Sequence, residues 1–216
     1  MVFGGCYASL SRRSLKPSLP SQTCTRCLPP RKISGVISAS HQENVRTKTP
    51  SGKLAPMWPE PGDWMRERLP LVVSDVGLVR QLGQVIERYE ATEIDASDRV
   101  LIHGDVGFHN LALDPDTDRV NGIFDYDSAA WADRHHDFRY LLFDVEREDL
   151  LDAALAAYVS HVGRTIIRDR VRLYNATCAI SYLAFRSGTP ADQKSCGRTL
   201  AEDLRWVCAA LAKLKL

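Results

Sequence analysis

The chain has 216 residues, of which 44% are hydrophobic and 25% are charged, a composition typical of a soluble globular domain that can bury a core. Its formal net charge of +1 gives no indication of a nucleic-acid or membrane partner. No apolar run approaches the ~18 residues that a transmembrane helix needs, so we expect none.

The six cysteines form no recognisable disulfide or zinc pattern. Cys24 and Cys27 make a single C-x-x-C, and a structural zinc site needs a second pair of ligands at a usable spacing. Cys178, Cys196 and Cys208 fall in apolar helical patterns and are typical of small buried or half-buried side chains. We therefore expect a reducing compartment and a cytoplasmic protein.

Residues 1–57 differ in composition from the rest of the chain. Residues 1–53 hold nine Lys or Arg and one acid, Glu43, whereas the remaining 163 residues hold 19 bases and 26 acids, a balance of −7. The segment is rich in Ser, Arg and Pro and has too little apolar surface to offset its ordering entropy. We expect 1–57 to be a disordered leader or a non-native extension, with an organelle transit peptide as the alternative. The folded unit would then be 58–216.

The globular part opens with two predicted helices. Asp63 is a candidate N-cap for a short helix that follows it. Apolar residues between Val76 and Tyr89 recur at three- and four-residue steps, which predicts an amphipathic helix over roughly 75–90.

Three short β-rich runs come next, at 99–103, 110–114 and 119–125. The sequence PDTD between the second and third runs is typical of a turn, so we expect these two to form a β-hairpin.

The rest of the chain has helical patterns. Helices are predicted over about 133–144, 147–163, 168–188 and 199–214, with Gly163 and Gly188 as stops. His135 and His136 would begin the first of these helices and face solvent. The fold class predicted from these elements is α+β, mostly α.

Polar side chains gather around the predicted strands. Asp105 lies just past the first strand, Asn110 opens the second, and Asp125 closes the third. Because a hairpin brings its two outer ends together, Asn110 and Asp125 should be neighbours, with Asp105 beside them. Such oxygen ligands suit Mg²⁺, and a free carboxylate close by can accept a proton from a hydroxyl. These are the parts that phosphoryl transfer needs.

This stretch resembles the catalytic segment of the aminoglycoside phosphotransferase family, small-molecule kinases of protein-kinase-like fold. The family pattern is H-G-D-x-x-x-x-N, a hairpin, a hydrophobic residue followed by D-[WFY], and then D-x-x-x-D. The chain matches it without a gap at His103-Gly104-Asp105, Asn110, Asp125-Tyr126, Asp133 and Asp137. The match is tight over about 40 residues and loose over 58–216, whose helices resemble that family's C-terminal lobe only.

The resemblance implies a role for each matched residue. Asp105 would be the catalytic base, and Asn110 and Asp125 would hold Mg²⁺ ions that bridge the phosphates of ATP. His103, Asp133 and Asp137 would give structural support, the two aspartates by pinning the next helix. His109 falls at a variable position of the motif and is interpreted as incidental.

The amino-terminal β-lobe of the family has no counterpart that we can identify. That lobe covers ATP and carries a lysine that contacts its phosphates. Lys32 and Lys53 lack flanking apolar strand residues, Glu43 lacks a helix, and residues 3–6 do not form the expected glycine-rich loop. The N-terminal β-lobe is therefore expected to be missing, and the chain could be a truncated and inactive copy, because even one lost electrostatic contact of this kind costs about 10²–10³ in rate.

Three functions stay open on the sequence alone. The first is ATP-dependent phosphate transfer to a hydroxyl of a small-molecule acceptor. The second is a non-catalytic lobe that binds a ligand or partner, and the third is a metal hydrolase that uses His103, Asp105 and His109. An acceptor would lie against the helices after residue 145. Acidic residues there could attract a cation or simply form a solvated face: Glu146, Glu148, Asp149 and Asp152.

Overall fold

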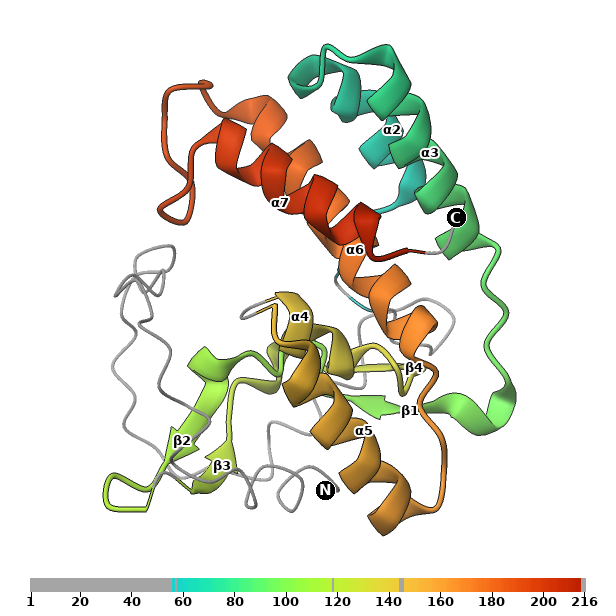
Figure 1. Ribbon diagram of the computed structural model, residues 1–216, viewed down its shortest axis with the longest axis vertical. Coiled ribbons are helices and arrows are strands. Elements are labelled where there is room, and N and C mark those ends of the chain that lie inside the picture. Colours follow the sequence, from blue (N-terminus) through green and yellow to red (C-terminus); the bar gives the residue numbers. More distant parts are fainter. Residues whose placement is uncertain (1–55, 57, 118, 144–145, 215–216) are drawn as a thin grey trace.

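The computed structural model describes residues 56, 58–117, 119–143 and 146–214, so the predictions for residues 1–55, including those for Cys24 and Cys27, lie outside the described residues. Within that part, helices dominate and two small two-stranded sheets accompany them (Figure 1). The predicted α+β, mostly α class is confirmed. No helix in the described part is both long and apolar enough to cross a membrane.

The first two helices form close to where the sequence predicts them. Helix α2 spans Gly62–Val72, and Pro61, not Asp63, is its N-cap. Asp63 lies in the first turn instead, where negative charge also favours the helix. Helix α3 spans Val76–Glu90, and the Asp75 carboxylate caps it by accepting hydrogen bonds from the Gly77 and Leu78 amides at 2.8 and 3.1 Å.

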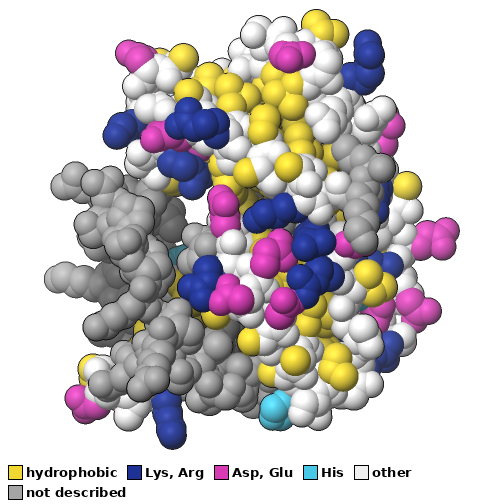
Figure 2. Space-filling model, viewed as in Figure 1, with side chains coloured by type: hydrophobic (Ala, Val, Ile, Leu, Met, Phe, Trp, Pro, Cys, Tyr) yellow, Lys and Arg dark blue, Asp and Glu magenta, His cyan; other side chains and the backbone are white. Residues whose placement is uncertain are grey.

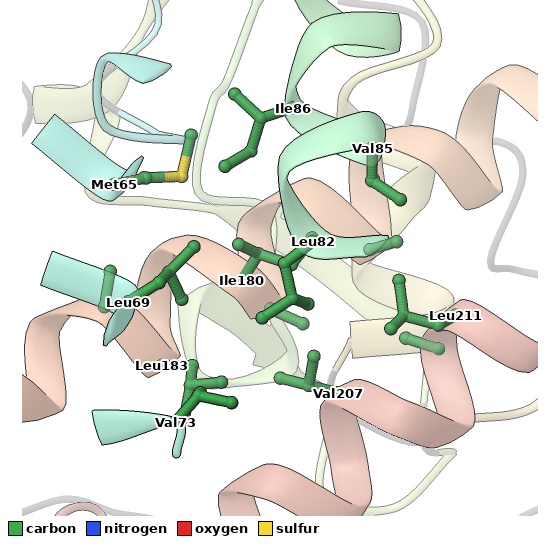
Figure 3. Close-up of a cluster of buried hydrophobic side chains, with 14 of the residues drawn as sticks. Met65, Leu69, Val73, Leu82, Val85, Ile86, Ile180, Leu183, Val207 and Leu211 are labelled. Carbon is green, nitrogen blue, oxygen red and sulfur yellow. The ribbon is translucent and has the colours of Figure 1, made fainter. Parts of the chain in front are cut away.

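Four helices share the main hydrophobic core. Helix α6 (Arg168–Phe185) packs against α2, α3 and helix α7 (Leu200–Ala212), and Figure 3 shows side chains of the four helices meeting in one cluster. Leu82, Ile180 and Leu183 are fully buried at the centre. Helix α7 begins with a capping box between Thr199 and Glu202, a local signal that fixes its start.

A second core lies below the first in Figure 1. It is formed by helix α4 (Tyr140–Phe143), helix α5 (Glu148–Val162) and the start of α6, with Leu151 and Val171 fully buried. Gly163 ends α5 with φ of 71°, as its predicted role as a stop requires. Gly188 ends a short 3₁₀ turn that follows α6.

The two sheets carry the site. Strands β2 (Leu111–Leu113) and β3 (Val120–Ile123) form the predicted hairpin. Strand β1 (Arg99–Ile102) pairs antiparallel with β4 (Ala130–Asp133), a strand that the sequence did not indicate. In β4, Ala130 and Ala132 are buried and Trp131 is 53% exposed, but two alanines give a weak β signal.

The helix predicted over 133–144 is therefore wrong in extent. Asp133 ends β4, a 3₁₀ turn spans Asp137–Arg139, and only 140–143 are α-helical. The Asp133 carboxylate accepts a hydrogen bond from the His135 amide at 3.0 Å, which favours a turn over a helix at this point. The solvent-facing position predicted for His135 and His136 is also wrong, because their exposures are 0% and 2%.

Candidate functional site

The loop after β1 and the outer end of the hairpin converge, as the sequence predicts. Asn110 directly precedes β2, and Asp125 follows β3 by one residue. Leu111 pairs with Ile123 across the hairpin, and the Phe124 amide donates to the Asn110 carbonyl at 3.1 Å. The backbones at Asn110 and Asp125 are therefore held side by side.

Gly104 allows the sharp turn between β1 and Asp105. Its φ is +80°, and a Cβ atom placed there would lie 2.2 Å from the Ser128 carbonyl oxygen. Both the left-handed backbone and the close approach require glycine. The turn thus brings the loop against the segment that follows Asp125.

The buried carboxylate of Asp137 fixes the backbone of this turn. Its carboxylate accepts hydrogen bonds from the His103 and Gly104 amides at 2.8 and 2.9 Å, and the residue is only 2% exposed. Burial raises the pKa of Asp137, opposed by these amides and by the charge of Arg139. Asp137 therefore supports the loop directly, not the next helix as the resemblance implied.

His103 joins the loop to the segment that carries Asp125. Its Nδ1 accepts a hydrogen bond from the Asp105 amide at 3.2 Å, so its Nε2 carries the proton and donates to the Phe124 carbonyl at 3.0 Å. The ring also lies 4.5 Å from that of Tyr126, measured between centroids. Because both ring nitrogens are occupied, His103 cannot bind a metal ion, and the hydrolase alternative loses one of its three ligands.

Asp105 receives three side-chain hydrogen bonds. Oδ1 accepts from the Tyr140 hydroxyl, and Oδ2 accepts from Asn110 Nδ2 at 3.1 Å and contacts His109 Nε2 at 3.4 Å. Burial raises the pKa of Asp105, but the contacts with His109, Tyr140 and Asn110 outweigh it and lower the pKa to about 2. The carboxylate is therefore ionised at neutral pH.

Asn110 and Asp125 present oxygen atoms of the kind that Mg²⁺ prefers. Asn110 is buried, and its Nδ2 donates to the backbone oxygen and to Oδ2 of Asp105, which leaves its Oδ1 unused by these two bonds. Asp125 has left-handed backbone with φ of 65°, and its side chain is exposed. One amide oxygen and one carboxylate fit an ion that takes its other ligands from phosphates and water. Among the described residues, no group of three or more His, Cys, Asp or Glu could hold a metal ion, so protein ligands alone would not suffice.

Asp133 lies apart from this loop. Its carboxylate accepts hydrogen bonds from Arg170 Nη1 at 3.1 Å and from the Tyr174 hydroxyl at 2.5 Å, and it pairs with His135. It therefore ties β4 to α6. Of the six residues singled out in the sequence, the structure brings five to the loop and places Asp133 in this separate buried cluster.

Sequence reasoning missed Arg139 and Tyr140. Arg139 is 2% exposed and donates to the Gly104 carbonyl at 3.0 Å, to the Tyr140 hydroxyl at 3.1 Å and to Cys178 Sγ at 3.2 Å. The two residues follow Asp137 closely, but their contacts depend on the loop and on α6, which are distant in sequence. His109, interpreted as incidental, contacts Asp105 directly.

A cavity of about 200 Å³ opens beside Asp105. Four aromatic residues line it, together with Asp105, His109, Arg139 and Cys178. The aromatic residues are Trp58, Tyr140, Phe143 and Tyr182. A small molecule in this cavity would therefore lie against apolar rings and within reach of the Asp105 carboxylate.

The acidic residues after residue 145 do not line this cavity. Glu148 accepts from Arg168 and Arg172 at 3.3 and 3.2 Å, and Asp149 and Asp152 pair with Arg147 and Arg168. Figure 2 shows acidic and basic side chains interleaved across this face of the molecule. These contacts favour the interpretation as a charged surface over an attractor for a cation.

Comparisons with known proteins identify one family. The model of the phosphotransferase enzyme family matches residues 33–174. Streptomycin 3''-kinase of Streptomyces griseus is 36% identical over 104 residues, which make up 45% of this chain and 36% of the relative. The match to the family model begins within the segment 1–57 and ends inside α6.

Two solved structures match part of this chain. A mutant aminoglycoside 2'-phosphotransferase IIIa in complex with GDP gives a TM-score of 0.47 at 18% identity, over 79% of this chain and 55% of that one. The GDP and kanamycin complex of the 2''-phosphotransferase IIIa gives 0.45 at 16% identity, over 79% and 56%. The chain thus spans about a third of the curated relative and just over half of each solved structure. Because the family model covers about two thirds of the sequence, this chain belongs to the phosphotransferase enzyme family.

Proposed function

We propose that the chain carries the catalytic loop and acceptor-binding part of an ATP-dependent phosphotransferase that acts on a hydroxyl of a small molecule. The observation that supports this most strongly is the convergence of Asp105, Asn110 and the Asp125 segment beside a cavity of about 200 Å³. Family membership and the oxygen-rich donor set agree with it.

In the proposed reaction, the acceptor hydroxyl lies in the cavity with its hydrogen directed at Asp105. The hydroxyl oxygen bonds to the γ-phosphorus of ATP as the bond from that phosphorus to the ADP oxygen breaks, and the proton passes to the Asp105 carboxylate. A carboxylate with a pKa of about 2 is a weak base, so its main contribution is to orient the hydroxyl. This suffices because phosphoryl transfer depends mostly on positioning and charge neutralisation.

Asn110 and Asp125 are the residues proposed to hold Mg²⁺, which would neutralise phosphate charge when bound. Asn110 also positions Asp105 through its Nδ2, so a single side chain would link the metal to the base. Tyr140, His103 and Asp137 fix the loop that carries the base.

A second candidate is a lobe that binds a ligand without chemistry. The described part of the chain contains two lysines, Lys194 and Lys213, and neither lines the cavity. A lysine that contacts the phosphates is thus not found within 58–214.

Titration of the full chain with Mg-ATP tests the nucleotide part of the proposal. We expect Asp125→Asn to weaken Mg²⁺-dependent binding by at least about tenfold. Asp127→Asn, which removes an exposed acid two residues away, should change it by less than about twofold. Equal effects of the two variants, or no binding by the unchanged chain, would contradict the proposed metal site.

Transfer of radiolabelled γ-phosphate from ATP to a small alcohol tests the catalytic part. Asp105→Ala should abolish transfer and leave Mg-ATP binding intact. Transfer that persists in Asp105→Ala would remove Asp105 as the base. Mg-ATP binding without any transfer by the unchanged chain would favour the second candidate.

A further inference from the structure

The charges around the cavity nearly cancel. Asp105 contributes one carboxylate and Arg139 one guanidinium, and the lining also includes the half-exposed His109. The Arg139 donors go to backbone oxygens, His136, Tyr140 and Cys178, and no described carboxylate lies within 4.0 Å of them. A cationic ligand would therefore meet a buried positive charge that forms no ion pair with a described acid.

Asp105 is the one acid among the described residues that line the cavity, and the nearby exposed Asp125 is the proposed Mg²⁺ ligand. Three of the acidic residues after residue 145, Glu148, Asp149 and Asp152, are paired with arginines outside the cavity. A ligand with several ammonium or guanidinium groups needs several carboxylates to replace its lost hydration. The cavity offers only Asp105.

The hydrogen-bonding capacity of the cavity is also small. A carboxylate has about four acceptor positions, and three on Asp105 are taken by Tyr140, Asn110 and His109. The hydroxyls of Tyr140 and Tyr182 donate to Asp105 and to Ser195 Oγ. One acceptor position therefore remains, which suits a single hydroxyl, and further buried hydroxyls would lose their partners at a cost.

The cavity is small and is lined mainly by aromatic rings. Ligand sites for drug-sized molecules have about 300–1,000 Å³, whereas this cavity has about 200 Å³, room for one ring. Its walls are the rings of Trp58, Phe143 and Tyr182 together with Tyr140, and aromatic walls favour apolar, flat partners. Resting on the proposed function, we propose that the acceptor enters this cavity as an uncharged, largely apolar ring with one hydroxyl directed at Asp105, not as a polycationic aminoglycoside.

Ligand-observed NMR with the full chain tests this proposal without nucleotide or metal. The probes are benzyl alcohol, benzyl methyl ether as its counterpart without a hydroxyl, myo-inositol as an uncharged polyol, and streptomycin and kanamycin as polycations. We expect benzyl alcohol to bind with a Kd on the order of 1 mM, at least about fivefold tighter than the ether. The polyol and both polycations should bind more weakly still.

Tyr182→Ala should weaken benzyl alcohol binding by about tenfold, because it removes one aromatic wall. Trp131→Ala, which removes an exposed ring on β4 outside the cavity, should leave it unchanged. The comparison of alcohol and ether tests the same contact if Tyr182→Ala does not fold. Tighter binding of streptomycin or kanamycin, equal binding of alcohol and ether, or no binding of benzyl alcohol would each overturn the proposal.

The binding measurements test the class of acceptor, and the transfer assay tests the proposed function, so the two can fail independently. A chain that binds benzyl alcohol as expected but transfers no phosphate would support the acceptor class and contradict turnover. A chain that phosphorylates an aminoglycoside through Asp105 would support turnover and contradict the acceptor class.

Discussion

The Asp133 carboxylate shows how a single buried charge joins distant parts of the chain. Its side chain is 2% exposed, and it receives hydrogen bonds from His135, Tyr174 and Arg170. Burial raises the pKa of Asp133, but these donors outweigh it and lower the pKa to about 2. The carboxylate is thus more stable as an anion in the folded chain than in the unfolded one.

Asp133 should make the stability of the protein sensitive to acid. Because its folded pKa of about 2 lies below the ordinary value of 3.8, its contribution is complete above about pH 4 and is lost as the pH falls toward 2. The shift corresponds to on the order of 2 kcal/mol. In urea unfolding between about pH 2.5 and 7, Asp133→Asn should lower the free energy of unfolding at neutral pH and flatten its decline in acid.

The exposed Asp127 provides the control for this measurement. Asp127→Asn should leave both the neutral value and the acid decline as they are in the unchanged chain. An acid decline of the same slope in Asp133→Asn would show that other carboxylates cause it.

At the scale of elements, the turn between β1 and the hairpin depends on one glycine. Gly104→Ala would force a left-handed backbone that costs about 1–2 kcal/mol, and its Cβ would clash with the Ser128 carbonyl oxygen at 2.2 Å. We expect a loss of at least about 2 kcal/mol in the free energy of unfolding. Gly83→Ala, in the middle of α3 with no atom within 4 Å of the new Cβ, should instead add about 0.5–1 kcal/mol.

Thermal and urea unfolding of both glycine variants measure these changes. A loss of stability in Gly83→Ala as large as in Gly104→Ala would show that alanine is tolerated equally badly at both positions. The close approach at Ser128 would then not be the reason for glycine in this turn.

The elements with strong local signals could be predicted, and those that depend on partners could not. Helix α3, the hairpin and the stop at Gly163 follow from periodicity, turn residues and a C-cap, all of which act within a few residues. Strand β4 forms because β1 pairs with it, and its short Ala-Trp-Ala sequence alone does not predict a strand. His135 and His136 are buried by α6 and its neighbours, a contact that no local pattern encodes.

In the candidate site, too, some residues could be placed from local sequence and others could not. Asp105, Asn110 and Asp125 could be placed together because strand ends and a hairpin determine their positions. The contacts of Arg139 and Tyr140 with the loop could not be predicted. They arise because Asp137 binds the Gly104 amide and so brings a segment distant in sequence against the loop. Long-range packing, not local sequence, therefore completes the surroundings of Asp105.

At the scale of the whole molecule, α6 joins the two cores. It contributes Ile180 and Leu183 to the core with α2, α3 and α7, and Val171 to the core with α4 and α5. In Figure 1, α6 runs from the upper helices to the lower part of the molecule. A single helix that is buried in both cores should couple their unfolding.

Leu183→Ala and Leu151→Ala test this coupling, since each removes a fully buried side chain from a different core. Each should cost about 2–5 kcal/mol and shift one shared transition. Tryptophan fluorescence, to which Trp64 and Trp206 of the first core contribute, should follow the same curve as far-UV circular dichroism in both variants. If Leu151→Ala shifts only part of the dichroism and leaves the fluorescence transition in place, the two cores unfold separately. The Asp105 loop, which Asp137 and Arg139 hold beside the start of α4, would then be lost before the main core.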